Sequence, residues 1–159
     1  APLRLPERDI HAFAEQHAAW LEAAVARARA GSRAAQRAGI LSETELQRLR
    51  TAARADLTER VTRLAARMGV DFAGITIRAQ RTRWGSCSAR GSLSFNCLLM
   101  LAPLEVREYV AVHELCHRKQ MNHSAAFWRE VASCLPDYAA QRAWLREHGP
   151  ALLGRLPET

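Results

Sequence analysis

The segment VHELCHRKQMNHSAAFW, residues 112–128, constrains this sequence more than any other. His113, Glu114 and His117 form the pattern H-E-x-x-H, and the residues before it, VREYVAV, are largely apolar. On a helix, positions i and i+4 share one face about 6 Å apart along the axis, so two imidazoles there can converge on one zinc ion. Histidines and a glutamate on a buried helix cost free energy unless they are paired or coordinated. The segment therefore predicts a metal-binding helix, with Glu114 able to reach a water molecule on the metal.

A catalytic zinc ion usually takes three protein ligands and leaves one position for water. His123 lies six residues after His117, past a short turn, and is the first candidate for the third ligand. The metzincin pattern has this spacing, but Gln120 stands where that pattern has glycine and no Met-turn follows. Glu130, on the next predicted helix, and Asp137, which can also cap a helix, stay open as alternatives. One zinc ion per chain is expected.

Hydrophobic periodicity predicts two helices in the N-terminal part of the chain, over residues 7–29 and 42–68. The first carries one apolar stripe, formed by Ile10, Phe13, His17, Trp20, Leu21 and Val25. The second opens with a capping box, Ser42 and Glu45, and is expected to end at Gly69. Residues 31–41 between them, GSRAAQRAGIL, are expected to form a loop or a frayed connector.

The pattern then changes to that of short strands. Residues 75–80, 81–88 and 92–101 predict a small, partly antiparallel sheet with a hairpin whose turn, Ala89-Arg90-Gly91, pairs Cys87 with Leu93. Three further helices are expected at 104–119, 125–134 and 138–148, the last ended by Gly149-Pro150. The chain is thus expected to be one α+β domain over 1–159, with a helical part at 7–68 and the sheet and active-site helices at 74–148.

Composition narrows the class of protein. With 48% hydrophobic and 25% charged residues the chain is typical of soluble globular proteins, and no apolar run approaches the roughly 20 residues of a membrane span. The four cysteines form no C-x-x-C pair, and no signal peptide is recognisable, which favours reduced thiols and a cytoplasmic protein. The net charge is +7, but the arginines are spread along the chain and no nucleic-acid-binding motif accompanies them. A nucleic-acid partner is therefore only weakly supported.

The motifs RTRWGSCS, LSFN…LAP, VHELCH, NHSAAFW and PDY, in this order over about residues 75–148, resemble the YgjP-like metallopeptidase family, which is more distantly related to SprT-like zinc proteases. The resemblance implies a zincin-like fold, zinc bound by His113, His117 and His123, and Glu114 as the catalytic carboxylate. Members of that family generally carry a β-rich segment before the helix that matches residues 7–29. This sequence starts near that helix, so the chain is expected to be either a natural short form or a truncated one, and only in the second case do part of the sheet and of the substrate groove lie upstream of it.

These expectations define a zinc-dependent hydrolase, most simply a peptidase acting on peptides or proteins. Glu114 would act as general base toward a zinc-activated water, and candidates for a second oxyanion donor are Tyr109, Tyr138, Arg83 and His148. We also expect the hairpin to border the cleft and to hold peptides as an added strand. The candidate substrate-binding residues are Arg83, Trp84, Asn96 and Tyr138.

Two other functions stay open from the sequence. In the first, the zinc site hydrolyses a non-peptide bond such as a nucleotide phosphoanhydride, with Arg78, Arg81 and Arg83 clamping phosphates. In the second, zinc only stabilises a binding module. The intact Glu114 argues against that module, because a structural site needs ligands alone and normally fills all four positions.

Overall fold

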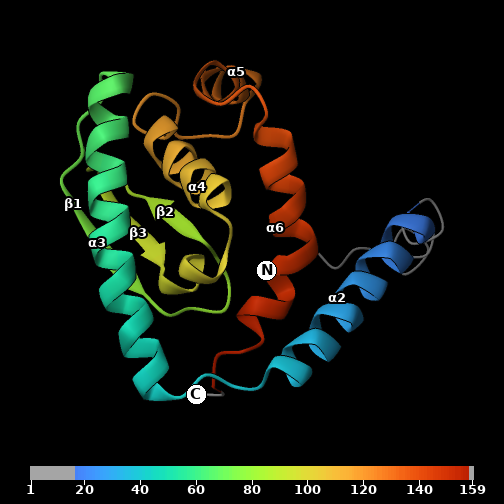
Figure 1. Cartoon of the computed structure of the whole chain (residues 1–159). Helices are drawn as coiled ribbons and strands as arrows, with labels where there is room; N and C mark the ends of the chain where they lie inside the picture. Colours follow the sequence, from blue (N-terminus) through green and yellow to red (C-terminus); the bar gives the residue numbers. More distant parts are fainter. Residues whose placement is uncertain (1–16, 158–159) are drawn as a thin grey trace, which may run out of the picture.

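A computed structural model describes residues 17–157 of the chain. Its helices and strands follow one another in the predicted order of helices, sheet and helices, shown in Figure 1. The elements are α2 (Ala18–Ala38), α3 (Glu43–Met68), β1 (Gly74–Arg78), β2 (Gly85–Cys87), β3 (Ser92–Asn96), the 3-10 helix η1 (Cys97–Leu101), α4 (Leu104–Cys116), α5 (Ala125–Cys134) and α6 (Tyr138–Leu153). The α+β class is therefore confirmed. Within residues 17–157 no helix is both long and apolar enough to cross a membrane.

The sheet has the order β1-β3-β2, with β1 and β3 parallel and β2 and β3 antiparallel. The hairpin register is the predicted one, because Cys87 lies opposite Leu93. Its turn closes at Gly91, whose φ of 82° lies in the left-handed region that glycine adopts readily. Residues 97–101, expected to continue the last strand, instead form the 3-10 helix η1. The sheet is thus mixed, with β2 at one open edge.

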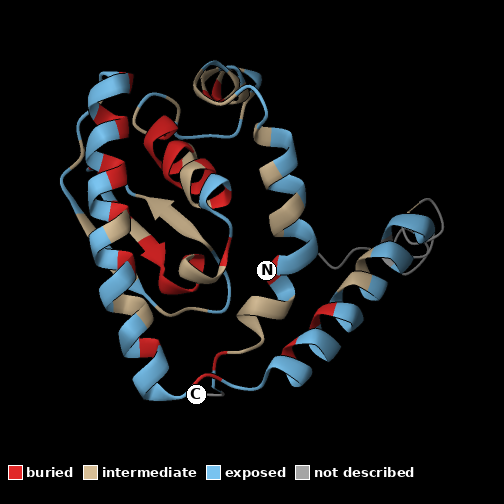
Figure 2. Ribbon diagram, viewed as in Figure 1, coloured by how far each residue is buried: buried red, intermediate tan, exposed pale blue. Residues whose placement is uncertain are grey.

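The core lies between the sheet and the helices α3 and α4, and Figure 2 shows buried residues along the faces that these two helices turn toward each other. α3 begins with the predicted capping box, in which Ser42 and Glu45 exchange hydrogen bonds, and ends at Gly69 in the left-handed conformation. The apolar residues that recur at helical spacing along α3 are buried, with Leu57 and Leu64 fully enclosed and Leu49 partly buried. The helical pattern of residues 42–68 therefore predicted both the helix and its inner face.

The connector predicted at residues 31–41 is wrong for residues 31–38, because α2 continues as a helix to Ala38 and only residues 39–41 are non-helical. Small residues explain this: a Cβ on Gly31 would lie 2.7 Å from Cβ of Pro150, and Ala35 is buried against Gly154 of the C-terminal region. α2 therefore packs its small-residue face on α6, outside the main core (Figure 1). The apolar stripe fits less well, since Trp20 is 62% exposed, and residues 7–16 lie outside the described part of the chain.

The last helix is also longer than predicted. α6 passes through Gly149-Pro150 and ends at Leu153. Both residues lie at close contacts: a Cβ on Gly149 would lie 3.3 Å from the ring of Trp84, and Pro150 contacts Gly31 of α2. Tertiary packing therefore overrides the tendency of Pro to end a helix. The consequence for the site is that α6 lies directly against Trp84, at the start of β2.

Candidate active site

The C-terminal half of α4 carries the histidine and glutamate motif. Val112, Leu115 and Cys116 are fully buried, so they fix this end of the helix against the core. His117 follows the last residue of α4 and keeps helical angles, with φ −64° and ψ −15°. The i, i+4 relation of His113 and His117 is thus preserved, and both rings leave the same face of the helix end.

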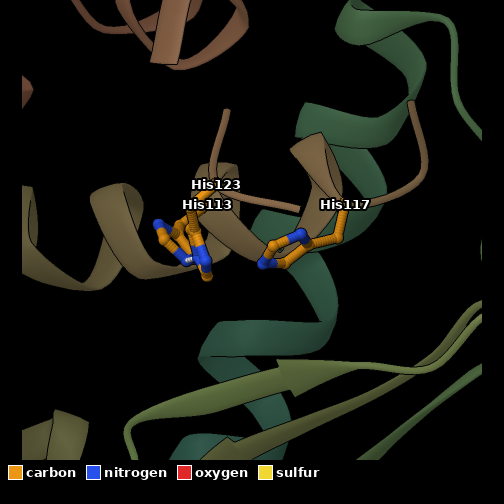
Figure 3. A group of neighbouring side chains, drawn as sticks. All are labelled: His113, His117 and His123. Carbon is orange, nitrogen blue, oxygen red and sulfur yellow. Dashed lines mark hydrogen bonds between the residues drawn. The ribbon is translucent and has the colours of Figure 1, made fainter. Parts of the chain in front are cut away.

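The loop between α4 and α5 returns His123 to these two histidines. The ring centroid of His123 lies 5.0 Å from that of His113 and 4.8 Å from that of His117. One ring nitrogen from each histidine lies within 4.8 Å of the other two, and no other group of three or more such ligands occurs within residues 17–157. Figure 3 shows His113 and His123 side by side, with the 3.0 Å contact between their Nε2 atoms, and His117 facing them.

The protonation of these rings suits a metal ion. Nδ1 of His117 lies 3.0 Å from the carbonyl oxygen of Gln120, to which it can donate, leaving Nε2 free as an acceptor. Burial and then the neighbouring rings of His117 and His123 lower the pKa of His113 to about 3, and burial lowers the pKa of His117, so both are neutral near pH 7. In a tetrahedral zinc site the Zn–N bonds are about 2.0–2.1 Å long, which places the ligand nitrogens about 3.3 Å from one another. The three histidines therefore fit zinc with small side-chain adjustments.

Glu114 lies beneath the histidines with only 5% of its surface exposed. Its close neighbour is the backbone of β2, because a Cβ on Gly85 would lie 2.5 Å from Oε1 of Glu114 and 2.7 Å from its Cγ. Burial raises the pKa of Glu114 to about 8, and the positive charge of Arg83 opposes this rise. Gly85 was not among the site residues predicted from the sequence. The RTRWGSCS motif contained it, but nothing in its spacing indicated contact with a residue 29 positions later.

An aromatic cluster supports the histidines from α5. Phe127 is fully buried, and its ring centroid lies 4.6 Å from that of His117, 4.8 Å from His123 and 4.9 Å from His113. The N-terminus of α5 is fixed by Ser124, whose Oγ accepts a hydrogen bond from the backbone N–H of Phe127, as the capping prediction required. Phe127 therefore packs against all three rings at once. Phe127 was not among the site residues predicted from the sequence.

The four candidate substrate-binding residues lie in different environments. Trp84 is partly buried at the start of β2, and Arg83 is exposed beside it. Tyr138 stacks on Trp128, with ring centroids 5.4 Å apart. Asn96 is fully buried: its amide nitrogen donates to the carbonyls of Gln80 and Arg83, and its oxygen accepts from the N–H of Leu98. Asn96 therefore holds the 80–83 loop in place instead of facing a substrate.

The other residues considered from the sequence are engaged elsewhere. Glu130 pairs with Lys119 at 3.1 Å, and Asp137 is exposed at the first turn of α6, so neither joins the histidine cluster. The guanidinium of Arg81 donates to the carbonyl oxygen of Leu156. His148 packs against Trp144, with ring centroids 4.6 Å apart.

Comparison with known proteins agrees with this geometry. The family model described as YgjP-like, metallopeptidase domain, matches residues 41–148. Among solved structures, the metallopeptidase zymogen abylysin of Pyrococcus abyssi superposes with a TM-score of 0.52 and 21% identity, over 56% of this chain and 90% of that one. The metallopeptidase zymogen jannalysin of Methanocaldococcus jannaschii superposes with a TM-score of 0.46 and 18% identity, over 55% of this chain and 94% of that one. No curated protein matches the sequence.

Abylysin, at this identity, supports the fold alone, and that fold is the zincin-like one expected from the sequence. The family model covers well over half of the chain and includes the whole helix that carries His113, Glu114 and His117. The chain therefore belongs to the YgjP-like metallopeptidase domain family and is a metallopeptidase-type hydrolase.

Proposed function

We propose that the chain is a zinc-dependent peptidase in which His113, His117 and His123 hold one zinc ion and Glu114 is the general base. The observation that carries this proposal is the meeting of three histidine nitrogens within 4.8 Å at the end of the helix that carries the buried Glu114. The exposed side of His123 leaves an approach to the site from solvent. Three histidine ligands and an open side are typical of catalytic zinc sites, whereas structural sites are usually closed by four ligands.

Zinc bound there would supply Lewis acidity, which lowers the pKa of a water molecule from 15.7 toward about 7. The positive charge of that zinc would favour the ionised form of the buried Glu114 carboxyl. Glu114 would then take a proton from the attacking water and deliver it to the leaving nitrogen of the peptide. Its surroundings serve this transfer, because the backbone of β2 at Gly85 and the interior of α4 confine the carboxylate to one position. Arg83 supplies a positive charge beside it. The remaining question is how a peptide is held.

The open edge of β2 is the proposed peptide-binding strand. The backbone N–H of Asn96 donates to the carbonyl of Trp84, and the backbone N–H of Ser88 donates to the carbonyl of Ser92. Trp84 and Ser88, which flank β2, therefore direct these backbone groups toward β3. In an antiparallel ladder the intervening residues, Gly85 and Cys87, then direct their N–H and C=O groups away from β3. A peptide added at this edge would form backbone hydrogen bonds next to Glu114, which tolerates many substrate sequences.

Metal analysis combined with a peptidase assay tests the proposal. We expect one zinc ion per wild-type chain, a weakened site in His123→Ala, and retained zinc with about 10²- to 10⁴-fold lower turnover in Glu114→Gln. Glu130→Ala is the matched control for a side chain near the loop that should leave zinc bound. Full activity of Glu114→Gln would refute the role of that carboxylate. Zinc-loaded wild type that hydrolyses no peptide would instead point to a structural zinc module or to another substrate.

A further inference from the structure

A stack of aromatic rings joins the histidine cluster to an arginine of α6 that the mechanism above does not use. Trp128 of α5 lies at its centre, with the Tyr138 ring 5.4 Å away and the His123 ring 5.9 Å away between centroids. Tyr138 stacks in turn on the buried ring of Tyr109, at 6.4 Å. The Cζ atom of Arg142 lies over the Trp128 ring, 4.4 Å from its centroid. We call Trp128, Tyr138 and Arg142 the Arg142 platform.

The positive charge of Arg142 has no carboxylate partner within the described residues 17–157. Arg118 and Lys119, which directly follow the second histidine of the motif, each form an ion pair at 3.1 Å. Arg142 is exposed and stacks on Trp128 instead. A guanidinium that stacks by its face keeps the N–H groups at its edge free, and these can bind a carboxylate through two parallel hydrogen bonds. Arg142 is therefore available to a carboxylate from another molecule.

The platform also holds this guanidinium in a defined place. Tyr138 and Arg142 are four residues apart on α6, so they share one face of that helix, and both pack on the Trp128 ring. A side chain that is already oriented loses less conformational freedom on binding than a mobile one. Arg146, exposed one turn further along α6, stacks on no ring of the described residues. The two arginines thus carry the same charge on the same helix, and only Arg142 is oriented.

The distances place Arg142 close to the reacting groups. Its Cζ atom lies 4.4 Å from the Trp128 centroid, and the His123 ring lies 5.9 Å from the same point, so the two are at most about 10 Å apart. After burial and the rings of His117 and His123, the charge of Arg142 also lowers the pKa of His113, which agrees with a short separation. An extended chain spans about 3.3–3.6 Å per residue. A carboxylate bound to Arg142 therefore lies within about three residues of the cleaved bond.

We propose that the Arg142 platform is a carboxylate-binding subsite, which selects peptides that carry an acidic group within about three residues of the cleaved bond. This inference rests on the proposed function, because it takes the three histidines as the place where the bond is cleaved. Arg142 binds the carboxylate, and Trp128 and Tyr138 orient Arg142. The carboxylate belongs to an acidic side chain or to the C-terminus of a short peptide, two sources with the same chemistry.

The test places a single aspartate at each of the three positions on either side of the cleaved bond of a neutral peptide. Each peptide is compared with its asparagine counterpart, which has the same shape without the charge. A further pair, with a free or an amidated C-terminus, separates the two sources of the carboxylate. Two quantities are measured: kcat/KM with zinc-loaded wild type, and the affinity for zinc-loaded Glu114→Gln by calorimetry.

We expect at least one acidic peptide to exceed its neutral counterpart about 5- to 20-fold in both quantities at low salt, between the values of an exposed ion pair and of a hydrogen bond to a charged group. The advantage should decrease in 1 M NaCl, where the screening length is about 3 Å. Equal values for every pair of peptides would overturn the subsite.

Arg142→Gln removes the charge of the platform, and Arg146→Gln is the matched control, the same change one turn further along α6 at an exposed position. We expect Arg142→Gln to reduce the ratio of acidic to neutral peptide to about twofold or less, and Arg146→Gln to leave it unchanged. A ratio that is unchanged in Arg142→Gln, or that decreases equally in Arg146→Gln, would refute the assignment. If no peptide is cleaved, the proposed function fails, and the calorimetric preference and its loss in an Arg142→Gln/Glu114→Gln protein still decide the subsite.

Discussion

The contact between Gly85 and Glu114 leads to a sharp prediction for the substitution Gly85→Ala. A methyl group at Gly85 would lie 2.5 Å from Oε1, 2.7 Å from Cγ and 2.8 Å from Cδ of Glu114. Ordinary contacts between carbon atoms lie at about 3.5–4.0 Å, so the carboxyl group must move by about 1 Å. All three close contacts involve the same side chain, and Gly85 does not have a positive φ, so the backbone of β2 can accept alanine.

The expected consequence is a loss of turnover without a loss of metal. A displacement of about 1 Å in a reacting group can cost about 100-fold in rate, which corresponds to about 2.7 kcal/mol in the activation free energy. The three atoms nearest to a Cβ on Gly85 all belong to Glu114, and none belongs to Phe127 or to the three histidines. The zinc content should therefore stay at one ion per chain. We therefore expect kcat for a peptide substrate to fall about 100-fold in Gly85→Ala.

The assay compares kcat, zinc content and thermal unfolding of wild type, Gly85→Ala and Gly74→Ala. Gly74 is the matched control, because it is an exposed strand glycine whose added Cβ would meet nothing within 4 Å. In a Glu114→Gln background the same Gly85→Ala change should cost little further activity, since both changes act through one side chain. If kcat in Gly85→Ala stays within about threefold of wild type, the carboxylate does not depend on this glycine and the reasoning is refuted.

Three further changes test the packing around the site and the stability of the fold. Phe127→Leu should lower zinc affinity about tenfold in a chelator competition, because Phe127 orients all three histidine rings; an unchanged affinity would contradict that role. Arg60→Met should lower the free energy of unfolding in urea by about 1–3 kcal/mol, since buried Arg60 binds one carboxylate on α3 and one on α4, while exposed Arg63→Met should cost less than about 1 kcal/mol. Ser42→Ala should lower the free energy of unfolding by about 1 kcal/mol, because it removes the N-cap of α3. Thr51→Ala changes an exposed residue inside the same helix, and an equal loss of stability there would argue against a capping effect.

Local patterns were sufficient for the features that depend on neighbouring residues. The 3.6-residue period of residues 42–68, with Ser42, Glu45 and Gly69 at its ends, predicted α3 and both of its caps. The turn residues around Gly91 predicted the hairpin and its register. The spacing of the three histidines likewise indicated that they could meet, although Glu130 and Asp137 stayed open as alternatives to His123, and the structure brings the three histidines together.

The features that were missed depend on contacts between distant segments. α2 extends past residue 31 because Gly31 and Ala35 pack against the end of α6, and nothing in the sequence near residue 31 records that partner. Asn96, a polar residue among apolar ones, was a reasonable candidate for substrate binding, but it bonds to the main chain of the 80–83 loop. A polar residue type alone does not distinguish these two roles.

The same distinction applies to the catalytic group itself. The H-E-x-x-H pattern supplies the metal ligands from a single helix end, but the position of the Glu114 carboxylate is set by the backbone of β2 at Gly85. That strand also offers the edge at which the proposed function adds a peptide. One short strand therefore links the placement of the base with the placement of the substrate. It follows that a related chain with the complete zinc motif and a bulkier residue in place of Gly85 should still bind zinc but hydrolyse peptides poorly.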